Sequence, residues 1–174
     1  MTLAVVQSFS VSIMQHMHQV SLLDANSALT GYMLFAALGM LLGGVVASRW
    51  PDFSDRVVAV CMAAGAVLIF LSGTGVMGAF GSMAILALTG LAIGIGGPSR
   101  DLLIRQSTPK GATGRVYGTV YSGLDVGFAI APLVFGLLMD RAWYGQTLML
   151  AALTLLISIG FALGVGQRVR QSSP

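Results

Sequence analysis

Apolar residues dominate six long runs of this chain, and short polar segments separate the runs. Each run has close to the roughly 20 residues that a helix needs to cross a hydrocarbon core of about 30 Å. Because lipid offers no partner to an unpaired backbone group, such runs form helices, and they exceed the roughly 10 residues of a barrel strand. The pattern predicts an all-α membrane protein, with one six-helix transmembrane domain over residues 1–174 and spans at about 3–23, 27–48, 57–74, 78–97, 115–138 and 145–166.

The polar breaks also indicate where helices end. Residues 24–27 read Asp-Ala-Asn-Ser, a turn in which Asn26 or Ser27 can cap the second helix. Residues 98–114 form the longest break, and residues 99–107 within it can form a short surface helix. We therefore expect the first turn near residue 25 and the end of the fourth span near residue 97.

Composition supports the membrane assignment and excludes several other classes. The 174 residues are 56% hydrophobic and 9% charged, whereas soluble domains have roughly 25% charged residues. Cys61 is the single cysteine and lies in the third run, so an intramolecular disulfide or cysteine-based metal cluster is not expected. There is no phosphate-binding loop or nucleophile elbow. The glycines of Gly94–Gly97 do not form a dinucleotide-binding motif, because that motif follows a strand and opens a helix, whereas this segment ends a predicted helix. We expect neither an enzyme nor a bound cofactor or metal.

The basic residues are distributed unevenly over the predicted loops. Eight of the nine Lys and Arg residues lie in alternate loops or after the sixth run, and only Arg141 lies in an opposite loop. Short cytoplasmic loops retain Lys and Arg, so both termini are predicted to face the cytoplasm across the cell (inner) membrane. The cations are scattered over three segments without interleaved aromatics, which argues against nucleic acid as a partner. The eight residues are Arg49, Arg56, Arg100, Arg105, Lys110, Arg115, Arg168 and Arg170.

One acidic residue lies within a predicted span. Asp125 is about ten residues into the fifth helix, or about 15 Å along it, which is close to the bilayer midplane. Tyr121 and Tyr117 precede it by one and two turns and share its stripe. A carboxylate at this depth usually faces a cavity or pairs inside the bundle. A proton-carrying role and a structural hydrogen bond to another helix are equally compatible with this pattern.

The first run carries polar residues on about half of its helical wheel. Gln7, Gln15 and His16 are among them, and they suit a helix that lines an aqueous path. The alternative is a helix whose polar face meets another protein or the membrane interface. His16 and His18 are two residues apart and do not share a face, which argues against a metal pair.

Many of the 23 glycines recur four residues apart, a spacing that lets membrane helices approach closely. This spacing predicts tight helix packing, and sliding or bending of helices is the alternative. The pairs are Gly39 and Gly43, Gly90 and Gly94, Gly114 and Gly118, Gly123 and Gly127, and Gly160 and Gly164.

Three segments together resemble a known family. They are Gly97-Pro98-Ser99-Arg100-Asp101, the stretch 111–118 that reads GATGRVYG, and the stretch 131–140 that reads APLVFGLLMD. These resemble the cytoplasmic loop and penultimate helix of major facilitator superfamily transporters, and the branch they look most like includes fosmidomycin-resistance-type efflux permeases. On this resemblance the whole chain is similar to the carboxyl-terminal six helices of a twelve-helix transporter, which is half of the major facilitator fold.

The resemblance also implies a cytoplasmic gate. The family commonly places a G-x-x-x-D-R-x-G-R-R loop between its second and third helices, and residues 44–52 are a degraded echo with Arg49 at the basic position. Arg100, Asp101 and Arg115 belong to the matching loop segments and are the other candidate gate residues.

The function implied by the resemblance is secondary active transport of small organic molecules by alternating access, with proton coupling. Asp125, Tyr121, Gln7, Gln15 and His16 are then the candidate cavity residues. As one half, the chain would work as a homodimer or with a separate N-terminal half. The alternative is a non-transporting membrane subunit or a truncated inactive fragment, and a start at Met1 without a preceding basic segment favours truncation.

Overall fold

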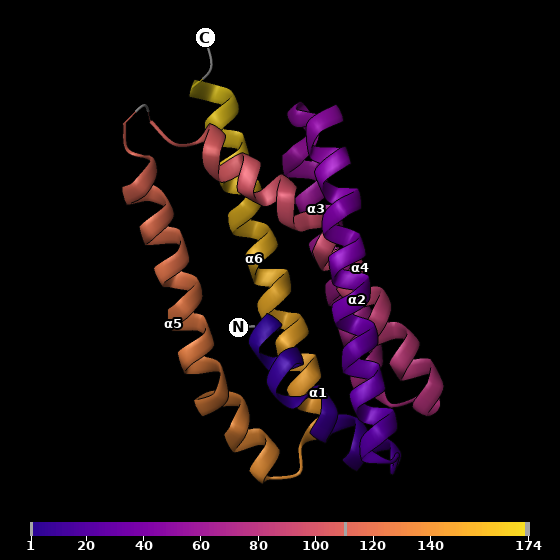
Figure 1. Cartoon of the computed structure of the whole chain (residues 1–174). Helices are drawn as coiled ribbons and strands as arrows, with labels where there is room; N and C mark the ends of the chain where they lie inside the picture. The colour runs from indigo at the N-terminus through magenta and orange to yellow at the C-terminus, as the bar shows by residue number, and fades with distance from the viewer. Residues whose placement is uncertain (1, 110, 173–174) are drawn as a thin grey trace.

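The protein folds into an up-and-down bundle of helices (Figure 1). The computed structural model describes the backbone of residues 2–109 and 111–172, and the side chains of residues 2–109 and 111–160. Over that part the predicted six-helix, all-α bundle is confirmed. The elements are α1 (Thr2–His18), α2 (Leu22–Arg49), the 3-10 helix η1 (Pro51–Phe53), α3 (Ser54–Thr74), α4 (Gly78–Gln106), α5 (Thr113–Asp140) and α6 (Tyr144–Ser172).

The described helices differ in their capacity to cross a bilayer. By length and composition, α2, the segment Pro51–Thr74, α4 and α5 can each span a membrane. The first helix, α1, has 17 residues, or about 25 Å, which is shorter than the predicted span 3–23. The stretch of α6 with described side chains, Tyr144–Gly160, is also apolar.

The first turn lies earlier than the sequence led us to expect. The helix α1 ends at His18, Gln19 has a φ of 52°, and α2 already begins at Leu22. Ser21 is the cap, because its Oγ accepts a hydrogen bond from the Asp24 backbone N at 3.2 Å and donates one to the Asp24 carboxylate at 2.7 Å. Ser27, which we expected in the turn, lies inside α2 and donates to the Leu23 carbonyl.

The fourth helix extends beyond its predicted end. It continues through Pro98 to Gln106, so the expected surface helix over 99–107 is the last part of α4. The long break predicted at 98–114 is therefore a short connection before Thr113, where α5 begins. Proline is tolerated inside membrane helices, because neighbouring groups re-satisfy the freed backbone carbonyl.

Glycine contacts hold the central helices together. A methyl group added to Gly39 of α2 would lie 2.5 Å from the Leu91 carbonyl oxygen of α4, and one added to Gly43 would overlap the Ile95 carbonyl. The reciprocal glycines of α4, Gly90 and Gly94, face the α2 backbone in the same way. The close packing predicted for these two pairs is confirmed.

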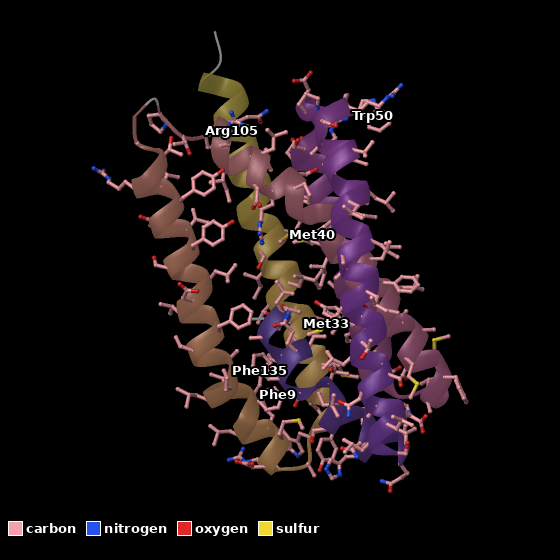
Figure 2. The ribbon with its side chains drawn as sticks, viewed as in Figure 1. Phe9, Met33, Met40, Trp50, Arg105 and Phe135 are labelled. Carbon is pink, nitrogen blue, oxygen red and sulfur yellow. The ribbon has the colours of Figure 1, made fainter. Side chains whose placement is uncertain are left out.

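The fifth helix packs loosely by comparison. It contacts mainly α1, and Phe135 is buried in a core cluster against which Phe9 of α1 packs (Figure 2). Added methyl groups at Gly114, Gly118 and Gly123 would meet no atom within 4 Å. The packing predicted for these α5 glycines is therefore not made within the described part of the chain.

The predicted clustering of basic loops agrees with the arrangement of the helices. The connections that follow α2 and α4 lie at the same end of the bundle, where Figure 2 labels Trp50 and Arg105. The helix α6 also ends there, whereas α1 starts partway along the bundle (Figure 1). Lys110 and the side chains of Arg168 and Arg170 lie outside the described residues.

Candidate functional site

The polar residues predicted on the first helix occupy different environments. Gln7 is exposed, Gln15 is half-buried, and His16 is exposed. The His16 ring stacks on Tyr144 of α6, with ring centroids 4.8 Å apart and planes 5° apart. This stack joins the end of α1 to the start of α6, at the end of the bundle away from the basic loops (Figure 1).

The fifth helix carries the predicted tyrosine and aspartate stripe. Tyr117 and Tyr121 stack with ring centroids 6.1 Å apart, and Asp125 follows one turn later with an exposed side chain. The Tyr117 hydroxyl donates a long hydrogen bond of 3.4 Å to the Asp101 carbonyl of α4. Within the described part of the chain, no hydrogen bond or ion pair joins Asp125 to Gln7 or His16. The predicted cavity residues therefore lie on two helices, α1 and α5, and these interactions do not join the two sets.

The predicted gate residues are partly brought together near the basic end. Arg100 and Asp101 form an ion pair, with Nη2 and Oδ1 3.2 Å apart, and both side chains are partly exposed. The Arg49 guanidinium lies 5.9 Å from the Trp50 ring centroid, a cation–π geometry. Arg115 is exposed in the first turn of α5. A shallow recess of about 320 Å³ lies beside this group, lined by Ser48, Asp101, Arg105 and Tyr117 among others.

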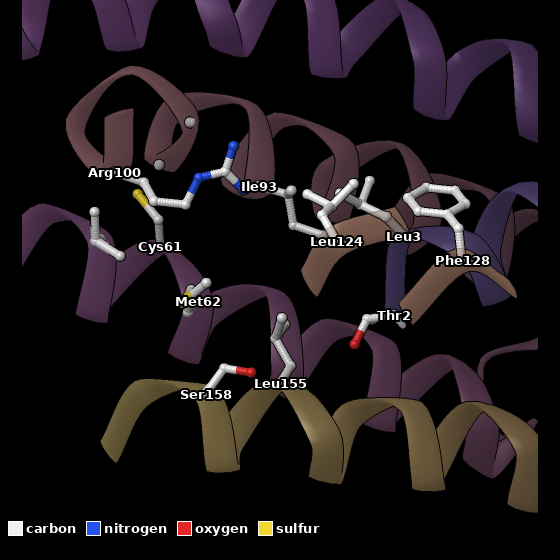
Figure 3. Close-up of a pocket in the computed structure, with 13 residues that line it drawn as sticks. Thr2, Leu3, Cys61, Met62, Ile93, Arg100, Leu124, Phe128, Leu155 and Ser158 are labelled. Atoms are coloured by element: carbon white, nitrogen blue, oxygen red, sulfur yellow. The ribbon is translucent and has the colours of Figure 1, made fainter. Parts of the chain in front are cut away.

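A second cavity was not predicted from the sequence. It has a volume of about 170 Å³, and residues of five helices line it (Figure 3). Arg100 is the one charged residue among the described residues that line it. Cys61 lines it as well, a position that its place in the third apolar run did not indicate. No spacing signal could have found the cavity, because Thr2, Phe128 and Leu155 come from three helices far apart in sequence.

The described residues contain no group of three His, Cys, Asp or Glu side chains that could hold a metal ion. A model of the major facilitator superfamily matches residues 1–173. The chain belongs to the major facilitator superfamily. Members of this superfamily are transporters rather than enzymes, so this major facilitator chain is a membrane transport protein in the general sense. The comparisons with curated proteins and with solved structures gave no match.

The superfamily match confirms the broad part of the resemblance. The six-helix bundle is consistent with half of a major facilitator fold, and the apolar helices fit a multi-pass membrane protein. The family model does not distinguish branches, so the fosmidomycin-resistance-type branch stays a prediction for this major facilitator protein.

Proposed function

We propose that this chain forms one half of a secondary active transporter, which moves small organic molecules by alternating access with proton coupling. In such a mechanism two helical halves rock about a site near the bilayer midplane. The chain supplies six helices, and its partner is a second copy or a separate N-terminal half. The bilayer and the transported molecule are the other partners.

The position of Asp125 carries this proposal. It lies 12 residues after Thr113 in a helix of 28 residues, or about 18 Å along it, and its side chain is exposed. A carboxylate facing lipid at the centre of a bilayer costs about 2.5–3.5 kcal/mol on insertion scales. The described helices leave this side of α5 uncovered, so a water-filled path or a second helical unit is the favourable surrounding for Asp125.

A flux measurement tests the transport proposal. Proteoliposomes with a trapped pH-sensitive dye would receive a panel of small organic acids, bases and neutral molecules under an imposed pH gradient. We expect at least one molecule to change the lumenal pH faster than in protein-free vesicles, with the chain alone or with a co-expressed N-terminal half. No such molecule under either condition would favour the non-transporting subunit.

We further propose that the basic end of the bundle faces the cytoplasm of the inner membrane. Arg49, Arg56 and Arg105 lie in the helix turns next to the connections that follow α2 and α4, and they support this orientation through the positive-inside rule. Alkaline phosphatase needs its disulfides and therefore the oxidising side of the membrane. Inserted in the turn at residues 75–77, it should be active, and fused after residue 174 it should be inactive. The reverse pattern would refute this orientation.

A further inference from the structure

The cavity of about 170 Å³ has one charged end and otherwise mainly apolar walls (Figure 3). Ile93, Leu124, Phe128 and Leu155 contribute apolar surface, and Arg100 brings a guanidinium from α4. Arg100 lies six residues before the end of α4, or about 9 Å inside it. Its side chain is 38% exposed, so it reaches the cavity from near the basic end of the bundle.

The hydrogen bonds that Arg100 makes to described residues leave much of its guanidinium open. Among the described residues, its two hydrogen bonds go to a single oxygen, Asp101 Oδ1, from Nε at 3.4 Å and from Nη2 at 3.2 Å. A guanidinium has five N–H donors. The pair joins adjacent residues, and the side chains are 38% and 44% exposed, so it holds the guanidinium only weakly.

The two hydroxyl groups that line the cavity already donate their protons to backbone carbonyls, so they are not available to bind an anion. The Ser158 hydroxyl already donates to the Thr154 carbonyl at 2.9 Å, and the Thr2 hydroxyl donates to the Ala151 carbonyl at 3.0 Å. Both hydroxyl protons are therefore engaged, and among the described lining residues Arg100 offers the strong hydrogen-bond donors that remain. The cavity thus combines a planar cationic donor with room for an apolar group.

We propose that this cavity binds a small organic carboxylate, with the carboxylate on the Arg100 guanidinium and an apolar body of about one six-membered ring between α3, α4 and α6. A guanidinium can donate two parallel hydrogen bonds to the two oxygens of a carboxylate. A cavity of about 150 Å³ lined by apolar side chains can hold benzene, which sets the size of the body. The role of the ligand as transported molecule or regulator rests on the proposed function, whereas its binding does not require transport.

Cys61 provides a built-in reporter for the experiment. It is the only cysteine of the chain and lines the same cavity, so its alkylation by N-ethylmaleimide can be followed by mass in the full detergent-solubilised protein. We expect saturating benzoate to slow alkylation of Cys61 at least about fivefold, because it fills the space beside the thiol. Benzamide has the same shape without the charge, and we expect it to leave the rate within about twofold.

Two variants assign the effect to Arg100. Arg100→Gln should abolish protection by benzoate, whereas Arg105→Gln should retain it, because Arg105 lies on the same helix but outside the lining of this cavity. Equal protection by benzoate and benzamide, protection that survives Arg100→Gln, or a Cys61 that does not react without ligand would each overturn the proposal. If Arg100→Gln cannot be purified, the comparison of benzoate with benzamide decides alone.

This outcome is separable from that of the flux measurement. Benzoate protection without any proton-linked flux would support the site and refute the transport proposal. Flux without protection would refute the site and leave the transport proposal standing.

Discussion

Replacing Gly43 by alanine is expected to lower the thermal unfolding midpoint and the yield of monodisperse protein, whereas Gly44→Ala leaves both nearly unchanged. The two glycines are neighbours in α2, so any gain in helix propensity is similar for both. A Cβ on Gly43 would overlap the Ile95 carbonyl of α4, and one on Gly44 would meet no atom within 4 Å.

The size of the effect follows from what the new methyl group meets. A backbone carbonyl in a helix cannot turn aside as a flexible side chain can, so α2 and α4 must separate. Overpacking of this kind costs typically about 1–3 kcal/mol. For a domain of this length each kcal/mol corresponds to about 2–4 °C in the unfolding midpoint. Fluorescence-detected unfolding in one detergent measures both variants, and equal midpoints would contradict the proposed role of the α2–α4 contact.

The glycine spacing shows which parts of the fold the sequence could predict. The number of helices and their up-and-down order follow from the long apolar runs. The glycine pairs Gly39 and Gly43, and Gly90 and Gly94, predicted a close helix contact that the structure confirms. The same spacing at Gly114 and Gly118 predicted a contact that the described part of the chain does not make. The spacing shows that one face of a helix carries small residues, but it does not show which other helix packs against that face.

The exact helix ends depend on which of several neighbouring residues makes the capping hydrogen bonds. Ser21, Asn26 and Ser27 can all cap a helix, and the carboxylate of Asp24 favours Ser21 because it accepts from the Ser21 hydroxyl. The fourth span was expected to end near residue 97, yet α4 continues through Pro98. Local propensity could not decide either case, since the outcome depends on hydrogen bonds made or replaced in the folded bundle.

The candidate site was predicted in part. The tyrosine stripe of α5 follows from four-residue spacing, and the stacked pair Tyr117 and Tyr121 is present in the structure. Arg100 and Asp101, adjacent residues in the last part of α4, form an ion pair. The cavity beside Arg100 needed the tertiary structure, because its walls come from helices at both ends of the sequence.

The second prediction with a large expected effect concerns proton coupling. Asp125→Asn is expected to reduce proton-driven flux at least about tenfold, because an amide of the same shape cannot release and regain a proton. Exchange of the transported molecule without a pH gradient should continue, since the size of the side chain is kept. Counterflow in the same proteoliposomes measures that exchange and separates lost coupling from lost folding.

Asp140→Asn is the matched control for this experiment. Asp140 is the last residue of α5 and is exposed, so the same change of charge occurs on the same helix but at its end. A carboxylate at a helix end meets water and headgroups, where a proton can be exchanged without crossing the bilayer. Flux that stays proton-driven in Asp125→Asn, or that falls equally in Asp140→Asn, would show that midplane position is not what matters. A loss of proton-driven flux in Asp125→Asn but not in Asp140→Asn would instead show that proton coupling depends on the exposed face of α5 near the bilayer midplane.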